Sequence, residues 1–162
     1  MGSFCLNSTS ELPLCQPIVR LPATASIVYN DLMEEKPIIL LAEDEEEIRT
    51  MYGDKLEREG FGVFKAQNGR ELLEMAKAHK PDLILLDLKM PIMDGLEAFQ
   101  KLKADPAMQG IPTVFLTAFS DPTTVSNEIE LVEKLGHVDF IKKGISLTDF
   151  VAEVKKHLPQ AN

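Results

Sequence analysis

The strongest constraint on the fold of this chain is a regular alternation, from Pro37 onward, of short apolar runs with amphipathic stretches. The apolar runs are bounded by Gly, Pro or charged residues, and they are mostly continuous. Continuous runs of this length are typical of strands that are buried on both faces of a sheet. We therefore predict five strands, at Ile38–Ala42, Phe61–Ala66, Leu83–Asp87, Thr113–Thr117 and Val138–Ile141.

Each predicted strand is followed by a stretch whose apolar residues recur at helical spacing. Gly60 and Gly136 follow two of these stretches as stop signals, and Ser146 with Asp149 forms a capping-box pattern at the start of the last one. We predict five helices, at Glu45–Glu59, Arg70–His79, Leu96–Ala104, Pro122–Leu135 and Leu147–Leu158.

This order of elements predicts an α/β domain. Parallel strands need crossover helices, so strand–helix units that follow one another five times indicate a parallel sheet. Five strands fit the flavodoxin-like, doubly wound order 2-1-3-4-5. In such a sheet, ligands bind at the carboxyl ends of the strands where the strand order reverses. Here that point lies between the first and the third strand, and we expect the functional site there.

The first part of the chain has a different composition. Residues 1–32 contain only three charged side chains, and prolines interrupt them without a sustained period. We interpret residues 1–36 as a poorly ordered N-terminal tail or linker, residues 37–158 as the folded domain and residues 159–162 as a short C-terminal tail. Two alternatives remain open: apolar residues of the first segment dock on the domain, or the functional protein begins at Met33.

Composition excludes several classes of function. A net charge of −9 and a pI of about 4.8 argue against nucleic-acid binding, which needs clustered Lys and Arg. The two cysteines, Cys5 and Cys15, lack the spacing of a metal site and form no disulfide framework. No apolar run reaches the roughly 18 residues of a membrane span, and the N-terminus lacks the pattern of a secretory signal. We therefore expect a cytoplasmic protein without a membrane partner.

Acidic residues follow the two strands that flank the expected site. The first predicted strand leads into Glu43 and Asp44, and the third ends at Asp87. Like charges about 4 Å apart repel by roughly 1 to 4 kcal/mol per pair, so such a cluster calls for a cation. Carboxylates are hard oxygen ligands, and Mg²⁺ is the expected occupant.

Two more polar residues are expected at the same edge of the sheet. The fourth strand ends at Thr117, and the fifth leads into Lys143. A carboxylate, a hydroxyl, an ammonium and a divalent cation around one point make a phosphoryl site. Asp87 would attack phosphorus in line and become an acyl phosphate. Beside the site, Asp94 is expected to be a turn or helix cap rather than a ligand.

Four segments of the chain resemble motifs of response-regulator receiver domains. The segment Leu83–Gly95 is similar to the phosphoacceptor motif, and three others match in the family's order and at predicted strand ends. They lie within residues 37–158, which makes the chain similar to a stand-alone receiver of two-component signalling. The other three segments are Ile39–Glu45, Val114–Ala118 and Phe140–Lys143.

The resemblance implies how a metal ion and the phosphoryl group would be held. Asp87 would be the phosphoacceptor. Asp44 and Asp87 would bind Mg²⁺ directly together with the main-chain carbonyl of Lys89, and Glu43 would act through water. Glu43 stands where the family usually has aspartate.

The resemblance also assigns roles at the end of the domain. Thr117 would bond the phosphoryl group, Lys143 would pair with it, and Phe140 would change position on activation. Gly144 follows where proline is usual, which leaves a choice between Lys142 and Lys143. The interval from Thr117 to Lys143 is a few residues longer than is usual in the family.

Three functions compete. The first is a switch, not an enzyme, that takes a phosphoryl group from a histidine kinase or histidine phosphotransfer protein, with Mg²⁺-dependent phosphorylation and autodephosphorylation. Its output would be contact with a target protein through the fourth helix, the fifth strand and the fifth helix. The second is a pseudo-receiver, a protein-binding scaffold that never takes phosphate. The third is an Asp-nucleophile phosphatase, whose nucleophile would follow the first strand instead of the third.

Overall fold

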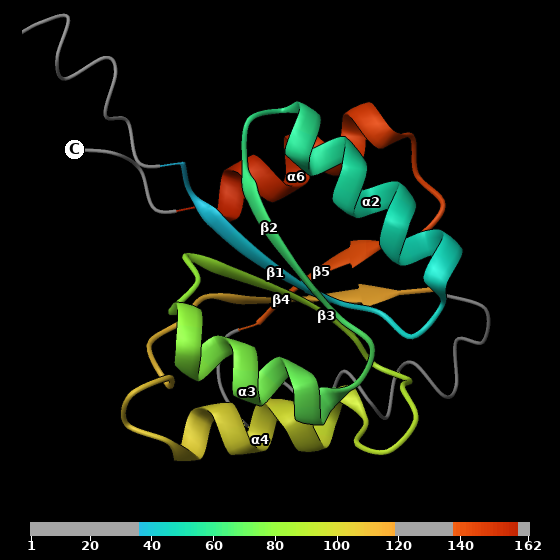
Figure 1. Ribbon diagram of the computed structural model, residues 1–162. Coiled ribbons are helices and arrows are strands. Elements are labelled where there is room, and N and C mark those ends of the chain that lie inside the picture. The colour runs from blue at the N-terminus through green and yellow to red at the C-terminus, as the bar shows by residue number, and fades with distance from the viewer. Residues whose placement is uncertain (1–35, 119–137, 159–162) are drawn as a thin grey trace, which may run out of the picture. The chain divides into compact units, whose positions relative to one another are not determined.

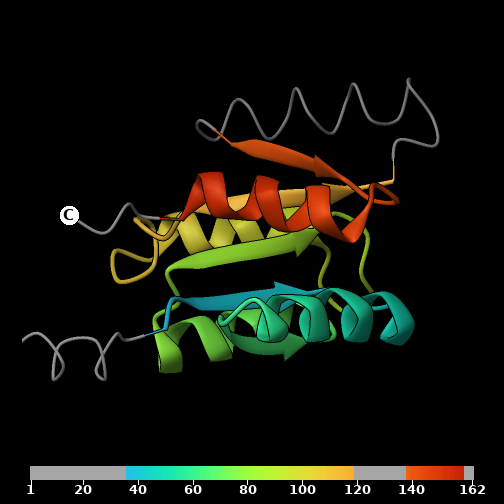
Figure 2. The ribbon, with the colours of Figure 1, turned by 90° about the horizontal axis from the view of Figure 1, so that it is seen from above.

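The computed structural model describes residues 36–118 and 138–158. Within them, five strands form one sheet in the order β2-β1-β3-β4-β5, and all neighbouring pairs are parallel, as predicted. Figure 2 shows the five arrows side by side, with β2 at one edge and β5 at the other. The strands are β1 (Ile38–Ala42), β2 (Gly62–Ala66), β3 (Leu83–Asp87), β4 (Thr113–Thr117) and β5 (Asp139–Lys142).

Helices cover both faces of this sheet. In Figure 1, α2 and α6 lie over one face and α3 and α4 over the opposite face. Within residues 36–118 and 138–158, none of the helices combines the length and the apolar character that a membrane span requires. The predicted helix at residues 122–135 and the predicted tails, apart from Lys36, lie outside the described residues. The described helices are α2 (Glu46–Arg58), α3 (Gly69–His79), α4 (Gly95–Ala104) and α6 (Leu147–His157).

The core consists of two apolar clusters, one on each face of the sheet. One cluster combines buried strand residues with α3 and α4, and the other combines them with α2 and α6. Successive strand residues point to opposite faces, so Leu40 belongs to the first cluster and Leu41 to the second. Because both faces are covered, the central strands carry continuous apolar runs.

Side-chain caps set where the helices begin. The Asn68 carboxamide oxygen accepts hydrogen bonds from two backbone N–H groups of the first turn of α3, and the Asp94 carboxylate accepts one from Glu97 N at 2.7 Å. These caps start α3 and α4 one residue earlier than predicted. At the start of α6, the Ser146 hydroxyl oxygen accepts from Asp149 N at 3.1 Å, which confirms the predicted cap.

A Schellman turn ends α2 and shifts the start of β2 by one residue. Gly60 has φ +97°, and its N–H bonds to the carbonyl of Glu57, while the N–H of Phe61 bonds to the carbonyl of Leu56. Phe61 is thus still tied to the helix end. The second strand therefore begins at Gly62, one residue later than the apolar run predicted.

Candidate functional site

The carboxyl ends of β1 and β3 lie side by side because these strands are neighbours in the sheet. Ala42 pairs with Leu86 at the end of their register, so Glu43 and Asp87 follow next to each other. Together with Asp44 they form a cluster in which one oxygen of each carboxylate lies within 4.8 Å of the others. Parallel pairing therefore gathers the three carboxylates that the sequence distributes over two strand ends.

The three carboxylates of this cluster differ in their exposure to solvent. Glu43 is fully buried, Asp87 is 6% exposed and Asp44 is exposed. Arg49, in α2, donates from its guanidinium to the backbone carbonyls of Glu43 at 2.7 Å and Asp44 at 3.0 Å. It fixes the backbone that carries two of the three carboxylates. Sequence reasoning missed Arg49, because locally it is one more polar residue of an amphipathic helix.

A single ammonium group contacts two of the carboxylates. Lys143 Nζ lies 2.7 Å from Glu43 Oε2 and 2.9 Å from Asp87 Oδ1. It also donates a hydrogen bond to Glu43 Oε1 at 3.0 Å, whereas its contact with Oε2 lacks hydrogen-bond geometry. The Lys143 side chain is only 12% exposed. These are short, largely buried ion pairs rather than a surface contact that solvent screens.

The sheet register decides which of the two lysines reaches the cluster. β5 begins and ends one residue later than predicted, so Lys142 is still in the ladder, paired with Thr117, and is exposed. Lys143 N then donates to the Thr117 carbonyl at 2.8 Å. The side chain of Lys143 therefore extends from the end of the strand to the carboxylates, whereas that of Lys142 does not.

The loop after β3 packs closely against the acidic end of that strand. Gly95 N donates to the Leu88 carbonyl at 3.0 Å, and a Cβ on Gly95 would collide with the backbone carbonyl of Asp87. Only glycine allows this approach. Asp94 caps α4, as predicted, and the Lys89 backbone N–H bonds to the Asp87 carboxylate. The loop thus helps to fix the Asp87 side chain.

Two residues with expected roles lie on the remaining strands. Thr117 is 4% exposed at the end of β4, one residue beyond Leu116, the partner of Asp87. Phe140 in β5 is half-buried and stacks on Phe115 with ring centroids 5.8 Å apart. The expected phosphoryl contact of Thr117 and the expected movement of Phe140 stay predictions.

Comparison with known proteins decides the family. Residues 39–155, well over half of the chain, match the family described as response regulator receiver domain. The chain belongs to the receiver domain family. The polar-differentiation response regulator DivK of Brucella anthropi is 32% identical to this receiver over 123 residues, which cover 76% of the chain and 97% of DivK. Receiver domains of this family are signalling switches of two-component systems.

Solved structures agree with the receiver fold. The signal receiver domain of a signal transduction histidine kinase from Syntrophus aciditrophicus is 32% identical, with a TM-score of 0.67, and the match covers 78% of this chain and 95% of that one. The chemotaxis protein CheY4 of Vibrio cholerae is 23% identical with a TM-score of 0.69, over 76% of this chain and 100% of that one. The second likeness concerns the fold alone.

Burial changes the protonation of this receiver's acidic cluster. It raises the pKa of Glu43 from its ordinary 4.5 to about 7; the Lys143 hydrogen bond opposes the rise and the Asp87 charge adds to it. Burial also raises the pKa of Asp87, again against the hydrogen bond from Lys143. Burial favours the neutral amine of Lys143, but its hydrogen bonds to Glu43 and Asp87 outweigh this and raise its pKa. Additional positive charge beside the carboxylates would favour their ionised forms.

The residues of the receiver's acidic cluster fit a divalent cation. Carboxylate oxygens are the ligands that Mg²⁺ prefers. Glu43 Oε2 is buried without a hydrogen-bond donor among the described residues, although the Lys143 ammonium lies beside it. Three carboxylates and one ammonium leave two negative charges uncompensated when all are ionised. Glu43, Asp44 and Asp87 therefore offer both the ligand atoms and the charge that Mg²⁺ requires.

Proposed function

We propose that this receiver domain is a phosphorylation-activated switch in which Asp87 accepts the phosphoryl group. One observation carries the proposal: the nearly buried Asp87 carboxylate is held between the Lys143 ammonium, at 2.9 Å, and two further carboxylates. A carboxylate that only ended a strand would need neither a buried ammonium on one side nor two further carboxylates on the other. The membership of residues 39–155 in the receiver family supports the same role.

In the proposed reaction, an Asp87 oxygen attacks the phosphorus of a phosphohistidine on a histidine kinase or phosphotransfer protein. The bond from phosphorus to the imidazole nitrogen breaks, and the imidazole leaves. The Lys143 ammonium then pairs with the transferred oxygens, and the Thr117 hydroxyl donates to one of them. Preorganised positive charge of this kind stabilises the transition state without reorganisation of solvent.

Glu43, Asp44 and Asp87, with the main-chain carbonyl of Lys89, would hold Mg²⁺. When bound, the ion supplies positive charge to the phosphoryl oxygens during both phosphorylation and autodephosphorylation. Without it, the three carboxylates repel the incoming phosphoryl group as well as one another. We therefore expect both reactions to depend on Mg²⁺.

The same proposal includes the limits of the domain, its location in the cell and its output surface. We assign the receiver unit to residues 37–158, with tails at residues 1–36 and 159–162, and the protein to the cytoplasm. Its output would be contact with a target protein through the face that contains β5 and α6 and the expected helix at residues 122–135. An acidic net charge of −9 gives no support for nucleic acid as the target.

The test is labelling of the full chain with acetyl phosphate and Mg²⁺, followed by intact mass. Asp87→Asn should take no phosphoryl group, whereas Asp94→Asn, a matched change in the same loop that keeps a capping side chain, should label like the wild type. Labelling of Asp87→Asn to the wild-type extent would show that the acceptor is another residue. A folded wild type that never labels would favour the scaffold, and hydrolysis of acetyl phosphate that persists in Asp87→Asn would favour a phosphatase whose nucleophile follows the first strand.

A further inference from the structure

The position of the Lys143 ammonium depends on how its backbone is held on both sides. On the N-terminal side, Lys143 N donates to the Thr117 carbonyl at 2.8 Å, which extends the ladder between β4 and β5 by one bond. On the C-terminal side the chain leaves the sheet and turns toward α6. A long, flexible side chain reaches a fixed point only if this turn is also fixed.

The turn after Lys143 is held by a hydrogen bond rather than by packing of its own side chain. Gly144 has φ +82°, and a Cβ built on it would meet no described heavy atom within 4 Å. Its N–H donates to the hydroxyl oxygen of Tyr52 at 3.3 Å, across 92 positions of sequence. Residue 144 must therefore provide an N–H group and tolerate a positive φ, and proline can do neither.

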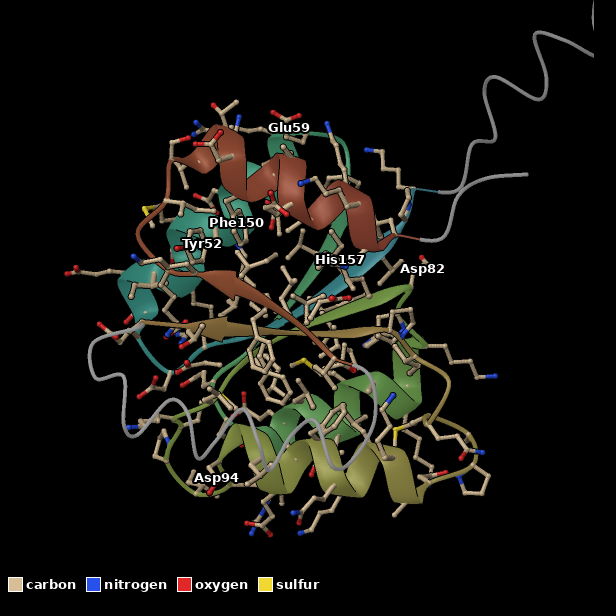
Figure 3. The ribbon with its side chains drawn as sticks, turned by 180° about the vertical axis from the view of Figure 1, so that it is seen from behind. Tyr52, Glu59, Asp82, Asp94, Phe150 and His157 are labelled. Carbon is tan, nitrogen blue, oxygen red and sulfur yellow. The ribbon has the colours of Figure 1, made fainter. Side chains whose placement is uncertain are left out.

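The acceptor of this bond is itself rigidly placed. Tyr52, in α2, is 2% exposed, and its ring stacks on Phe150 of α6 with centroids 4.1 Å apart and planes 15° apart. Figure 3 labels Tyr52 and Phe150 next to each other, at α2 and α6. A packed ring leaves the hydroxyl oxygen little freedom, so it is a fixed point for the Gly144 N–H.

The helix that carries Tyr52 also holds the acidic side of the site. Arg49, three residues earlier in α2, donates to the carbonyls of Glu43 and Asp44. One rigid helix thus contacts the backbone of the carboxylate loop and the backbone of the lysine turn. It links the two halves of the ion pair from Lys143 to Glu43, which spans 100 positions of sequence.

We propose that Tyr52 is a positioning residue for Lys143. By accepting the Gly144 N–H, its hydroxyl fixes the turn after β5, so that the Lys143 ammonium stays within reach of Glu43 and Asp87. Tyr52 touches neither the carboxylates nor a phosphoryl group in this role, and it acts only through the lysine. The consequence for phosphoryl transfer rests on the function proposed above.

The kinetic test uses Tyr52→Phe in the full chain, because phenylalanine keeps the stacked ring and removes the acceptor. With acetyl phosphate and saturating Mg²⁺, the rate constant of phosphorylation should fall roughly 3- to 10-fold, the range expected for one neutral hydrogen bond. Gly144→Asn keeps the N–H and tolerates a positive φ, so this control should react within about twofold of the wild type. In a Lys143→Gln background, Tyr52→Phe should have no further effect.

A second readout does not depend on phosphorylation. In the unphosphorylated protein, hydrogen exchange at the Gly144 amide should be at least about threefold faster in Tyr52→Phe than in the wild type, while amides of β1 and β3 keep their protection. All variants are compared at a temperature at which circular dichroism shows them folded. If the wild type takes no phosphoryl group, the proposed function is wrong, but the exchange test of Tyr52 still applies. Two results would overturn the role of Tyr52. One is a Tyr52→Phe variant whose Gly144 amide exchanges at the wild-type rate. The other is a Tyr52→Phe change that slows phosphorylation equally in the wild type and in the Lys143→Gln background.

Discussion

Replacing Glu43 by glutamine should change how the stability of this domain depends on pH. Glu43 is fully buried, and its pKa is raised from 4.5 to about 7. Between these values the folded chain keeps a proton that the unfolded chain has released. By linkage, the free energy of unfolding that this proton contributes is present at low pH and is lost as pH rises toward and through 7. Glutamine keeps the size and an acceptor for Lys143 but does not titrate.

The size of the effect follows from the change in pKa. At about 1.4 kcal/mol per pKa unit, a rise from 4.5 to about 7 corresponds to roughly 3.5 kcal/mol in total. Between pH 5 and pH 8, the free energy of unfolding of the wild type should therefore fall by about 2 to 3 kcal/mol relative to that of Glu43→Gln. At pH 8 without metal the variant should be the more stable protein, because the wild type then buries an additional charge.

Urea unfolding followed by circular dichroism measures this difference at pH 5, 6, 7 and 8, with EDTA present throughout. Glu47→Gln is the matched control, since Glu47 is an exposed carboxylate in the first turn of α2 outside the cluster. Its free energy of unfolding should run parallel to that of the wild type. Parallel curves for the wild type and Glu43→Gln as well would refute the argument that burial raises the pKa of Glu43.

Mg²⁺ should offset this pH dependence. Binding to ionised carboxylates displaces the Glu43 proton, so the increase in melting temperature caused by Mg²⁺ should be larger at pH 8 than at pH 6. At a concentration of about 100 times the dissociation constant, the ion should stabilise the wild type by roughly 2.7 kcal/mol. Asp44→Ala should remove this stabilisation. A wild-type melting temperature that is indifferent to Mg²⁺ at pH 8 would contradict a cation site in the cluster.

Three further predictions concern the segment that leads from β3 into α4, and urea unfolding measures each of them. Gly95→Ala should lower the free energy of unfolding by about 1 to 3 kcal/mol, because its Cβ collides with the Asp87 carbonyl; wild-type stability would contradict this. Ile92 is 72% exposed with φ +71°, so Ile92→Asn should stabilise the domain by about 1 kcal/mol, and a destabilised variant would show that Ile92 makes a compensating contact. Asp94→Ala should cost about 1 kcal/mol through loss of the α4 cap, whereas Asp94→Asn should cost much less; equal losses would point to a role of the charge.

Much of the fold follows from the sequence alone. The runs that predict β1, β3 and β4 match the observed strands residue for residue, because strands buried on both faces require continuous apolar side chains. The alternation with helices predicts a parallel sheet, and five strands fit the doubly wound order 2-1-3-4-5 that the structure has, which places Glu43, Asp44 and Asp87 at one edge. The limits of a strand are visible in its own apolar run, and the topology is visible in the order of the elements, so a sequence contains both.

The identity of the lysine at the site was decided by tertiary structure. The apolar run Val138–Ile141 gives the fifth strand to within one residue, but one residue determines whether Lys142 or Lys143 leaves the sheet toward Asp87. Side chains alternate along a strand, so register controls direction. Pairing with β4, which the apolar pattern does not encode, fixes that register.

What the sequence determined by itself is therefore the parallel sheet and the three carboxylates at its edge. What only the tertiary structure decided is how the site is held. Arg49 and Tyr52 look like ordinary residues of an amphipathic helix, and Gly144 like an ordinary turn residue, until α2 packs beside the ends of β1 and β5. The physical reason is that apolar periodicity records burial along one element, whereas a hydrogen bond across 92 residues depends on where two elements meet.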